Sequence, residues 1–458
     1  MNRVPSEIFK AYDIRGVVDT VLTSDVVEMI GQSIGSEARE RGLKAIAIGR
    51  DGRLSSPSLA QALANGLQKS GLQVIDVGMV PTPILYFAAH ELCDYTGVMI
   101  TGSHNPPDYN GMKIVLGGET LAAQTIQALR IRIENNDLIT GEGSYRTHLI
   151  TPTYIQRIVD DVKLTRPIKI VVDSGNGVTG AFAPELYRKM GCEVTELFCD
   201  VDGTFPNHHP DPSVPENLQD VIRTLKTTDA ELGFAFDGDG DRLGLVTKDG
   251  SIIYPDRQLM LFAADVLARN PGGEIIFDVK CTRNLAKWIE QHGGKPIMWK
   301  TGHSFIKGKL KETGALLAGE MSGHIFFKER WYGFDDALYT AARLLELLSK
   351  QSDINATLHA LPDALNTPEL QIKLKEGENH TLIAQLQKSA RFDHPERIIT
   401  IDGLRVEYKD GFGLIRASNT TPVAVLRFEA DNPEALHRIQ QDFRNVILTF
   451  KPDAVLPF

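Results

Sequence analysis

Three aspartates alternate with glycine in "DGDGDR", where Asp237, Asp239 and Asp241 follow the apolar run "LGFAF". Three carboxylates this close repel one another unless a cation holds them, and the glycines let the backbone curl around such an ion. Oxygen ligands favour Mg²⁺, Mn²⁺ or Ca²⁺. An EF-hand loop would need glycine at its sixth and glutamate at its twelfth position, where this chain has Arg242 and Lys248. We therefore predict a divalent-metal site of another kind, with coordination positions left open.

A serine, a histidine and a lysine stand close together in "TGSHNPPDYNGMK", residues 101–113. The apolar run "YTGVMI" before it predicts a buried strand, and the Gly, Asn and Pro that follow predict an irregular loop. Ser103 offers a hydroxyl, His104 an imidazole and Lys113 a cation. These groups make the loop a candidate for nucleophilic and acid–base chemistry.

Two further loops carry groups that suit a sugar phosphate. Glu320 and Ser322 in "GEMSGH" (319–324) suit sugar hydroxyls, and "RASNTTP" (416–422) joins a guanidinium to three hydroxyls and an amide. Arginine binds two phosphate oxygens at once, so the second loop is a candidate phosphate site. The candidate ligand contacts, including isolated positions in "KAYDIRG", "DVKCTRN" and "KTGHS", are Tyr12, Arg15, Lys280, His303, Glu320, Met321, Ser322, Gly323, His324, Arg416, Ala417, Ser418, Asn419 and Thr420.

Length and composition limit the class of protein. A chain of 458 residues is too long for one hydrophobic core, and 42% hydrophobic with 24% charged residues is typical of soluble globular proteins. A net charge of −10 without a basic block argues against nucleic acid or a membrane surface as the main partner, but allows a small anion. The four cysteines show no metal spacing, and no segment has the length of a secretory or membrane-spanning apolar run. We expect a cytoplasmic protein with reduced thiols.

One pattern of strand, polar loop, helix, glycine and strand occurs three times, starting at "KAIAIGRDGR", "IKIVVDSGNGVTG" and "GEIIFDVKCTRN". Each copy continues to an apolar run that ends in a candidate loop. Ligands of α/β sheets gather beyond the carboxyl ends of strands, so three such units can direct three loops to one cleft. We predict three related α/β domains, residues 1–150, 151–251 and 252–364, and a smaller α+β domain, residues 365–458.

The four loops, in this order and at these separations, resemble those of the α-D-phosphohexomutase superfamily, over essentially the whole chain. "GEMSGH" and the "KAYDIRG" start are most similar to the bacterial phosphomannomutase/phosphoglucomutase branch. The resemblance implies an α/β protein of four domains around a central cleft, the last of them α+β and like the TATA-box-binding protein. It implies the reversible interconversion of hexose 1-phosphates and 6-phosphates of mannose and glucose, by a monomer that acts on small molecules.

The resemblance also implies roles for the candidate residues. Ser103 would carry a phosphoryl group whose oxygens complete the coordination of Mg²⁺ beside the three aspartates. The hexose 1,6-bisphosphate intermediate would turn around in the cleft, and glucose or mannose 1,6-bisphosphate would activate the enzyme. Arg242 would bind the transferring oxygens. His104 and Lys113 would exchange protons, and which of them is the base stays open.

The remaining implied contacts would hold the two ends of the sugar. Glu320 and Ser322 would bind O3 and O4, which glucose and mannose share, and the non-reacting phosphate would lie against Arg416, Ser418, Asn419 and Thr420. A phosphoglucosamine mutase is the alternative, but such enzymes usually carry glutamine where this chain has Met321. A serine phosphatase would release inorganic phosphate, and a sugar-phosphate sensor would be expected to lack the serine or an aspartate.

Overall fold

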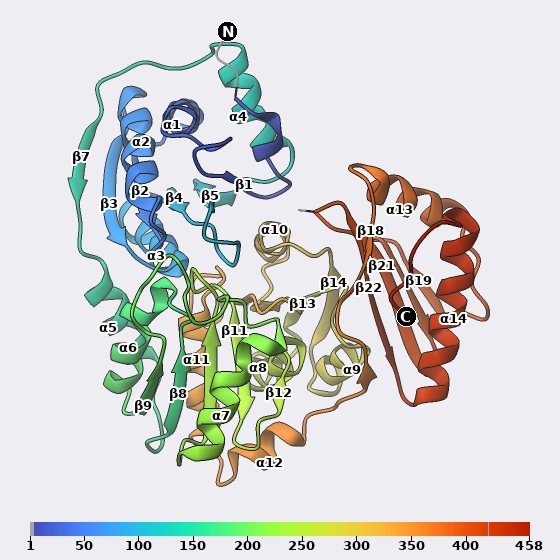
Figure 1. Ribbon diagram of the computed structural model, residues 1–458. Coiled ribbons are helices and arrows are strands. Elements are labelled where there is room, and N and C mark those ends of the chain that lie inside the picture. Colours follow the sequence, from blue (N-terminus) through green and yellow to red (C-terminus); the bar gives the residue numbers. More distant parts are fainter. Residues whose placement is uncertain (1–3, 420) are drawn as a thin grey trace.

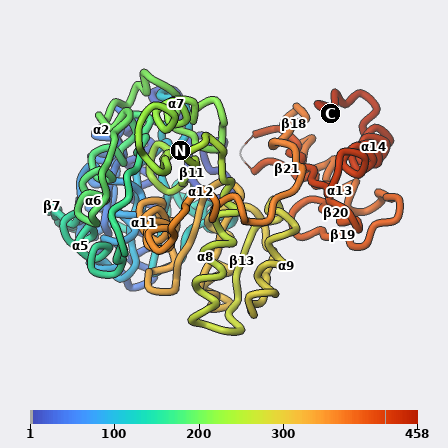
Figure 2. Tube along the Cα trace, turned by 90° about the horizontal axis from the view of Figure 1, so that it is seen from below, coloured from blue at the N-terminus to red at the C-terminus, as the bar shows by residue number. Residues whose placement is uncertain are grey.

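The computed structural model describes residues 4–419 and 421–458, which fold into four domains in chain order (Figure 1). The first three pack into one body and the fourth stands beside it (Figure 2). One apolar core runs through the first three domains, with Phe87, Phe234 and Phe277 among its buried side chains. The fourth domain has a core of its own. No helix within the described residues is both long and apolar enough to cross a membrane.

The first domain is a sheet between helices. It comprises η1 (Ser6–Ile8), β1 (Ile14–Val17), α1 (Ser24–Glu40), β2 (Ala45–Arg50), α2 (Ser56–Lys69), β3 (Gln73–Met79), α3 (Thr82–Leu92), β4 (Gly97–Ile100), β5 (Tyr109–Leu116), β6 (Glu119–Thr120), α4 (Gln124–Glu134) and β7 (Ser144–Thr147). The strand order is β1-β5-β4-β2-β3-β7, with β6 paired to β5. Helices α1, α2 and α4 cover one face and α3 the other, which explains why β2 and β4 are nearly continuous apolar runs.

The second domain carries the aspartate loop. It comprises α5 (Thr151–Asp161), β8 (Lys169–Asp173), η2 (Val178–Ala181), α6 (Ala183–Lys189), β9 (Glu193–Leu197), η3 (Pro215–Leu218), α7 (Gln219–Thr227), β10 (Leu232–Phe236), β11 (Leu243–Thr247) and β12 (Ile252–Ile253). The order is β12-β11-β10-β8-β9. β10 lies between β8 and β11 and is buried along its whole length up to Asp237. Its sheet extends two residues past the boundary predicted at residue 251.

The third domain comprises α8 (Pro255–Arg269), β13 (Glu274–Asp278), α9 (Arg283–Gln291), β14 (Lys295–Trp299), α10 (His303–Thr313), β15 (Leu317–Gly319), β16 (Ile325–Phe327), α11 (Ala337–Leu348) and α12 (Ile354–His359). The strand order is β14-β13-β15-β16. Helix α11 packs against β16 of its own domain and against β11 of the second. This helix therefore fixes the third domain against the second.

These three domains repeat one strand order. In each, a central strand lies between the two parallel strands that follow it in the chain, and a fourth strand runs antiparallel to the third. The orders are β3-β2-β4-β5, β9-β8-β10-β11 and β14-β13-β15-β16. The repeat predicted from the sequence is confirmed, and each candidate loop lies between the third and fourth strands of its unit.

The fourth domain is an antiparallel sheet with helices on one face (Figure 1). It comprises β17 (Leu365–Asn366), β18 (Leu370–Lys373), α13 (Glu378–Ser389), β19 (Arg397–Ile399), β20 (Leu404–Tyr408), β21 (Gly411–Ala417), β22 (Val423–Ala430) and α14 (Pro433–Phe450). Asn432 caps α14, and proline at its first position suits a helix start. On the other face, Phe412 and Leu414 pack against Val279 of the third domain. That contact turns the loop after β21 toward the other candidate loops.

Candidate active site

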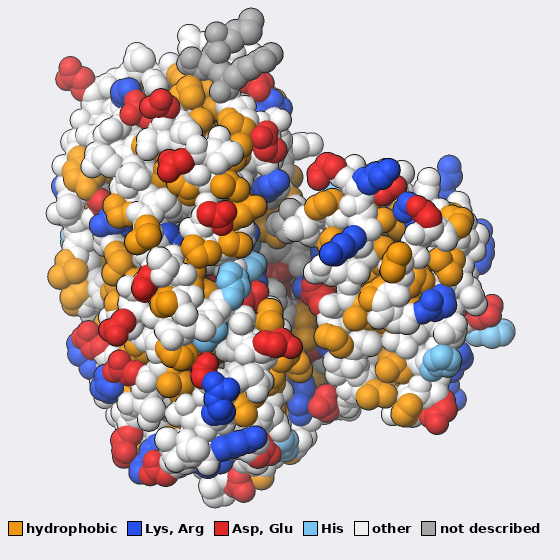
Figure 3. Space-filling model, in the orientation of Figure 1, with side chains coloured by type: hydrophobic (Ala, Val, Ile, Leu, Met, Phe, Trp, Pro, Cys, Tyr) orange, Lys and Arg blue, Asp and Glu red, His pale blue; other side chains and the backbone are white. Residues whose placement is uncertain are grey.

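A cavity of about 550 Å³ lies where loops from all four domains meet, and Figure 3 shows the groove between the fourth domain and the rest. The loop after β21 faces the loops of the three repeated units across it. Sequence-predicted residues that line the cavity are Tyr12, Arg15, Ser103, His104, Lys113, Arg242, Lys280, His303, Glu320, Met321, Ser322, His324, Arg416, Ser418 and Asn419.

Five predicted residues within the described part of the chain do not belong to this lining. Ala417 ends β21 and is packed into the core of the fourth domain, and Gly323 makes the turn of its loop with φ of 106°. Thr420 lies outside the described residues. The three aspartates of "DGDGDR" are completely buried beneath the cavity wall. There Asp237 accepts a hydrogen bond from Ser103, and Asp239 accepts one from Lys113.

Ser103 stands at the centre of the site in a left-handed backbone conformation, φ 49°. Its Oγ donates to Asp237 Oδ2 at 3.0 Å and lies 3.1 Å from Nδ1 of His104. A Cβ at Gly238 would come within 2.2 Å of the Ser103 carbonyl oxygen, so the glycine allows the metal loop to touch the serine loop. A backbone in this region is uncommon for serine.

A buried arginine that the sequence reasoning missed holds the serine loop in place. Arg53 follows β2, and its guanidinium donates to the carbonyl oxygens of Ser103 at 2.9 Å, Asn105 at 2.6 Å, Tyr109 at 2.9 Å and Pro106. Asp51 pairs with its Nε at 3.2 Å. Four carbonyl groups of an irregular loop are thus bound by one planar donor.

The aspartate loop wraps around its own first carboxylate. Asp237 Oδ1 accepts hydrogen bonds from the backbone N–H groups of Gly240, Asp241 and Arg242 at 3.0–3.1 Å. Lys113 donates to Asp239 at 2.7 Å and also to Asp241. These two carboxylates raise the pKa of Lys113 well above its usual range, against the effect of burial. The two carboxylates therefore favour the charged form of Lys113.

The three carboxylates fit a divalent cation. Each offers an oxygen, and these oxygens lie within 4.8 Å of one another. Oδ1 of Asp239 and Oδ1 of Asp241 are buried and have no hydrogen-bond partner among the described residues. Buried carboxylate oxygens without a donor are costly, and a hard cation would satisfy them. The three aspartates, with Ser103 Oγ on Asp237, are therefore candidate ligands of a divalent cation.

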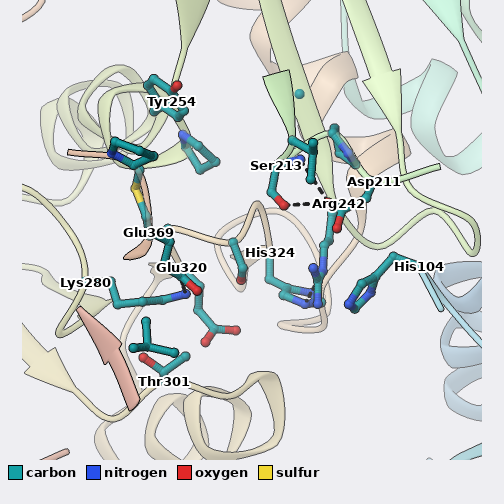
Figure 4. Close-up of a pocket in the computed structure, with 18 of the residues that line it drawn as sticks. His104, Asp211, Ser213, Arg242, Tyr254, Lys280, Thr301, Glu320, His324 and Glu369 are labelled. Carbon is teal, nitrogen blue, oxygen red and sulfur yellow. Dashed lines mark hydrogen bonds and ion pairs between the residues drawn. The ribbon is translucent and has the colours of Figure 1, made fainter. Parts of the chain in front are cut away.

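Arg242 connects the metal loop to the "GEMSGH" loop. Its Nε donates to Nε2 of His324 at 3.0 Å, and Figure 4 shows the Arg242 side chain between His104 and His324. Burial, and after it the charges of Arg242 and Arg15, lower the pKa of His104 well below its usual range. Arg15 in turn donates to the Asn105 side chain at 2.8 Å. Two arginines therefore flank the serine loop on the side of the cavity.

Glu320 lies across the cavity beside Lys280 and Thr301 (Figure 4). It is 1% exposed, and its Oε1 accepts from the backbone N–H of Gly302. Burial, helped by Asp278, raises the pKa of Glu320 to about 7. Its Oε2 has no hydrogen-bond partner within the described part of the chain. A buried acceptor without a donor beside a polar cavity is suited to a ligand hydroxyl.

The fourth-domain loop is bound to the third domain through Asp402. Asp402 Oδ2 accepts from Arg416 Nε and from the backbone N–H of Thr301, both at 3.0 Å. Lys280 pairs with Glu369 at 2.8 Å. The sequence offered no signal for Asp402 or Glu369, because single carboxylates in polar stretches are common on protein surfaces. With these partners, Arg416 and Lys280 are neighbouring cations on one wall of the cavity. Nearby, the ring of Tyr12 packs edge-on against that of His303, with 5.2 Å between the ring centroids.

Comparisons with known proteins agree with this geometry. Family models described as phosphoglucomutase/phosphomannomutase match along the chain: α/β/α domain I at residues 6–140, domain II at 152–250, domain III at 254–365 and the C-terminal domain at 369–446.

Similar proteins cover the full length. The chain is 59% identical to a phosphoglucomutase of Neisseria meningitidis serogroup A, over 100% of both chains. It is 58% identical to the phosphomannomutase/phosphoglucomutase of Pseudomonas aeruginosa PAO1, over 99% of this chain and 98% of the relative. A crystal structure of a family protein from Burkholderia thailandensis superposes with a TM-score of 0.95 at 59% identity, over 99% of this chain and 100% of the other. The chain belongs to the phosphoglucomutase/phosphomannomutase family of the α-D-phosphohexomutase superfamily.

Proposed function

We propose that this protein reversibly interconverts the 1-phosphates and 6-phosphates of glucose and mannose, with Ser103 as the residue that carries the phosphoryl group. The observation that supports this most directly is the contact of Ser103 Oγ with Asp237 at 3.0 Å, within a cluster of three buried carboxylates. Relatives at 58–59% identity are named phosphoglucomutase and phosphomannomutase/phosphoglucomutase, which supports both substrate classes.

In this proposal, Asp237, Asp239, Asp241 and the phosphorylated Ser103 would hold Mg²⁺, which would neutralise charge on the phosphoryl group. Phosphoryl transfer depends on position and charge more than on a strong nucleophile. Arg242 supplies a guanidinium for the oxygens of the transferring group. Lys113 supplies a fixed positive charge at the carboxylates.

The first transfer breaks the bond between phosphorus and Ser103 Oγ and forms a bond between phosphorus and the free hydroxyl oxygen of the sugar phosphate. The product is the hexose 1,6-bisphosphate, and the proton of the sugar hydroxyl leaves to a base in the cavity. His104 Nδ1 lies 3.1 Å from Ser103 Oγ, within reach of a proton at that oxygen. The reverse transfer, from the other phosphate of the turned intermediate, restores phosphoserine.

The opposite wall explains how one site can serve both orientations. Arg416 and Lys280 would hold whichever phosphate is not reacting, and Glu320 and Ser322 would bind the hydroxyls O3 and O4. In this arrangement neither Glu320 nor Ser322 contacts the hydroxyl at C2, the carbon at which glucose and mannose differ. Both sugars would therefore be accepted. Because one chain supplies every group of the cavity, we propose that it acts as a monomer on small hexose phosphates.

The test is a mutase assay with Mg²⁺ and a trace of glucose 1,6-bisphosphate. Glucose 1-phosphate, mannose 1-phosphate and glucosamine 1-phosphate are compared, and inorganic phosphate is followed in parallel. We expect comparable rates on the first two and little on the third. Dominant turnover of glucosamine 1-phosphate would move the substrate to an amino sugar, and phosphate release without isomerisation would show a phosphatase.

A further inference from the structure

A second cavity, of about 340 Å³, lies between the first and third domains. Residues of α3, β5 and β6 line it on one side, and residues of α10 and of the chain that follows β16 line it on the other. It shares no described lining residue with the active-site cavity, so the proposed reaction gives it no role. Cavities of this size at a domain interface are typical sites for small ligands.

Five aromatic rings form a continuous series along this cavity. In order they are Tyr95, His90, Tyr332, Phe334 and Tyr86, with neighbouring ring centroids 4.2–5.8 Å apart. Tyr95 is 50% exposed and Tyr86 only 5%, so the series runs from the protein surface to the interior. These rings offer a flat apolar ligand an extended aromatic surface.

The lining also carries an excess of positive charge. Lys307, Lys311 and Lys328 line the cavity, and no aspartate or glutamate does so within the described residues. The side chain of Lys307 is 10% exposed and pairs with Asp335 at 3.0 Å. Lys311 and Lys328 are exposed, and neither has an ion pair in the part of the chain that the structure describes. These two lysines therefore give the mouth of the cavity a positive potential.

The outermost ring and one of these lysines lie close together. Gly118 forms part of the wall, and a Cβ at this position would lie 3.6 Å from Cβ of Tyr95 and 3.8 Å from Nζ of Lys311. Glu91 contacts Nδ1 of His90 at 3.3 Å but does not line the cavity. An anionic group at the mouth would thus meet Lys311, while a ring attached to it extends inward along the aromatic series.

We infer that this cavity binds a planar aromatic anion, with its ring against the aromatic series and its anionic group at Lys311 and Lys328. Such a ligand contacts the first and third domains at once and leaves the active-site cavity open. A segment of another protein fits less well, because the cavity has the volume of a small-molecule site. The inference concerns binding alone and does not depend on the proposed mutase function.

The probe is 8-anilinonaphthalene-1-sulfonate, an aromatic anion whose fluorescence reports an apolar binding site. N-phenyl-1-naphthylamine, the same ring system without the sulfonate, is the neutral probe. Both are titrated into the folded full-length protein and into the double variant Lys311→Gln/Lys328→Gln. We expect the double variant to bind the anionic probe about tenfold more weakly, and the neutral probe less than about twofold more weakly.

Two further variants separate the contributions of charge and ring. Lys295→Gln/Lys350→Gln is the matched control, because it removes two exposed lysines of the third domain that do not line the cavity. It should bind both probes as the wild type does. Tyr332→Ala should weaken both probes about fivefold, since it removes a ring from the series. Equal affinity of the anionic probe for the wild type and for Lys311→Gln/Lys328→Gln would overturn the inference.

Competition identifies the source of the ligand and separates this site from the active site. ATP, GTP and UTP represent nucleotides, and phenylpyruvate and indole-3-acetate represent aromatic carboxylates. Displacement of the anionic probe by either group supports the inference and names the class of ligand. Displacement by neither group, or displacement by glucose 1,6-bisphosphate, would overturn it. Probe binding is measured without turnover, so an inactive protein that still binds the probe would count only against the proposed function.

Discussion

The ammonium group of Lys113 lies 2.7 Å from the carboxylate of Asp239, although 126 residues separate them in the chain. Lys113 belongs to β5 of the first domain and Asp239 to the loop after β10 of the second. Both are almost completely buried. The contact joins the serine loop to the metal loop and supplies the charge that these carboxylates need in the absence of a metal ion.

Replacing Lys113 with methionine therefore leaves buried carboxylates without their cation. We expect the metal-free variant to lose about 3–5 kcal/mol of unfolding free energy, as when one partner of a buried ion pair is removed. Mg²⁺ binds only the folded state and therefore stabilises it. The gain in unfolding free energy on adding Mg²⁺ should be larger for the variant than for the wild type. Thermal unfolding with EDTA and with Mg²⁺ measures both effects. An equal Mg²⁺ effect on the two proteins would argue against a metal at these aspartates.

Ser103→Ala should abolish mutase turnover, to below about 10⁻³ of wild type, while the fold is retained. The intact mass should lack the phosphoryl group that the wild-type protein carries after incubation with glucose 1,6-bisphosphate. Ser213→Ala is the matched control, because Ser213 also lines the cavity but its hydroxyl bonds within its own loop to Asp211 at 2.6 Å. Normal activity of Ser103→Ala would remove the serine from the mechanism.

Arg53→Lys tests the clamp on the serine loop. A lysine is a single donor centre and cannot reach the four carbonyl oxygens that the guanidinium satisfies. We expect a loss of about 2–4 kcal/mol in unfolding free energy, from carbonyl groups left unpaired in a buried loop. We also expect kcat to fall about 10²-fold because Ser103 is no longer held. Denaturant unfolding and steady-state kinetics check the two effects, and unchanged kcat in a destabilised variant would limit Arg53 to a structural role.

Glu320 should make the stability of the protein depend on pH. Its folded-state pKa of about 7 is above the ordinary value of 4.5, so the folded state binds the proton more tightly than the unfolded state. The stability from this proton is complete below about pH 4.5 and is lost as the pH rises to about 7. Glu320→Gln removes that loss. From pH 5 to pH 8, the unfolding free energy of the variant should rise by about 2.5 kcal/mol relative to that of the wild type. Urea unfolding at both values measures it, and parallel profiles would contradict the raised pKa.

The loops of the site could be predicted from the sequence because each carries its chemistry locally. "DGDGDR" concentrates three carboxylates within five residues, and "TGSHNPP" follows an apolar run that predicts a buried strand. The repeat was visible for a similar reason: strand, helix and glycine recur in the same order, and the three sheets have the same strand order. The site residues in these loops needed no knowledge of distant contacts.

Arg53 and Asp335 could not be predicted, because their roles exist only in the folded protein. A single arginine after a strand has the pattern of a surface residue, yet Arg53 binds a loop 50 residues away. Asp335 stands beside Asp336, and one aspartate before α11 already meets the need of a helix for an N-cap. The second is explained only by the folded structure, in which Lys307 Nζ donates to Asp335 at 3.0 Å. Ala417 is the reverse case: it was selected with the loop that contains Arg416, and the alternation of β21 turns its side chain into the core of the fourth domain.

The distribution of the cavity over four domains has a consequence for biosynthesis. The groups proposed to act in turnover extend from Tyr12 to Asn419, and the second neighbour of β21 in the sheet is in place only when β22, ending at Ala430, pairs with it. In a nascent chain on the ribosome, the serine loop and the aspartate loop are therefore synthesised well before the fourth-domain loop that is proposed to bind the non-reacting phosphate. Turnover starts only when nearly the whole polypeptide has been released, so incomplete translation products are inactive toward the cell's hexose phosphates.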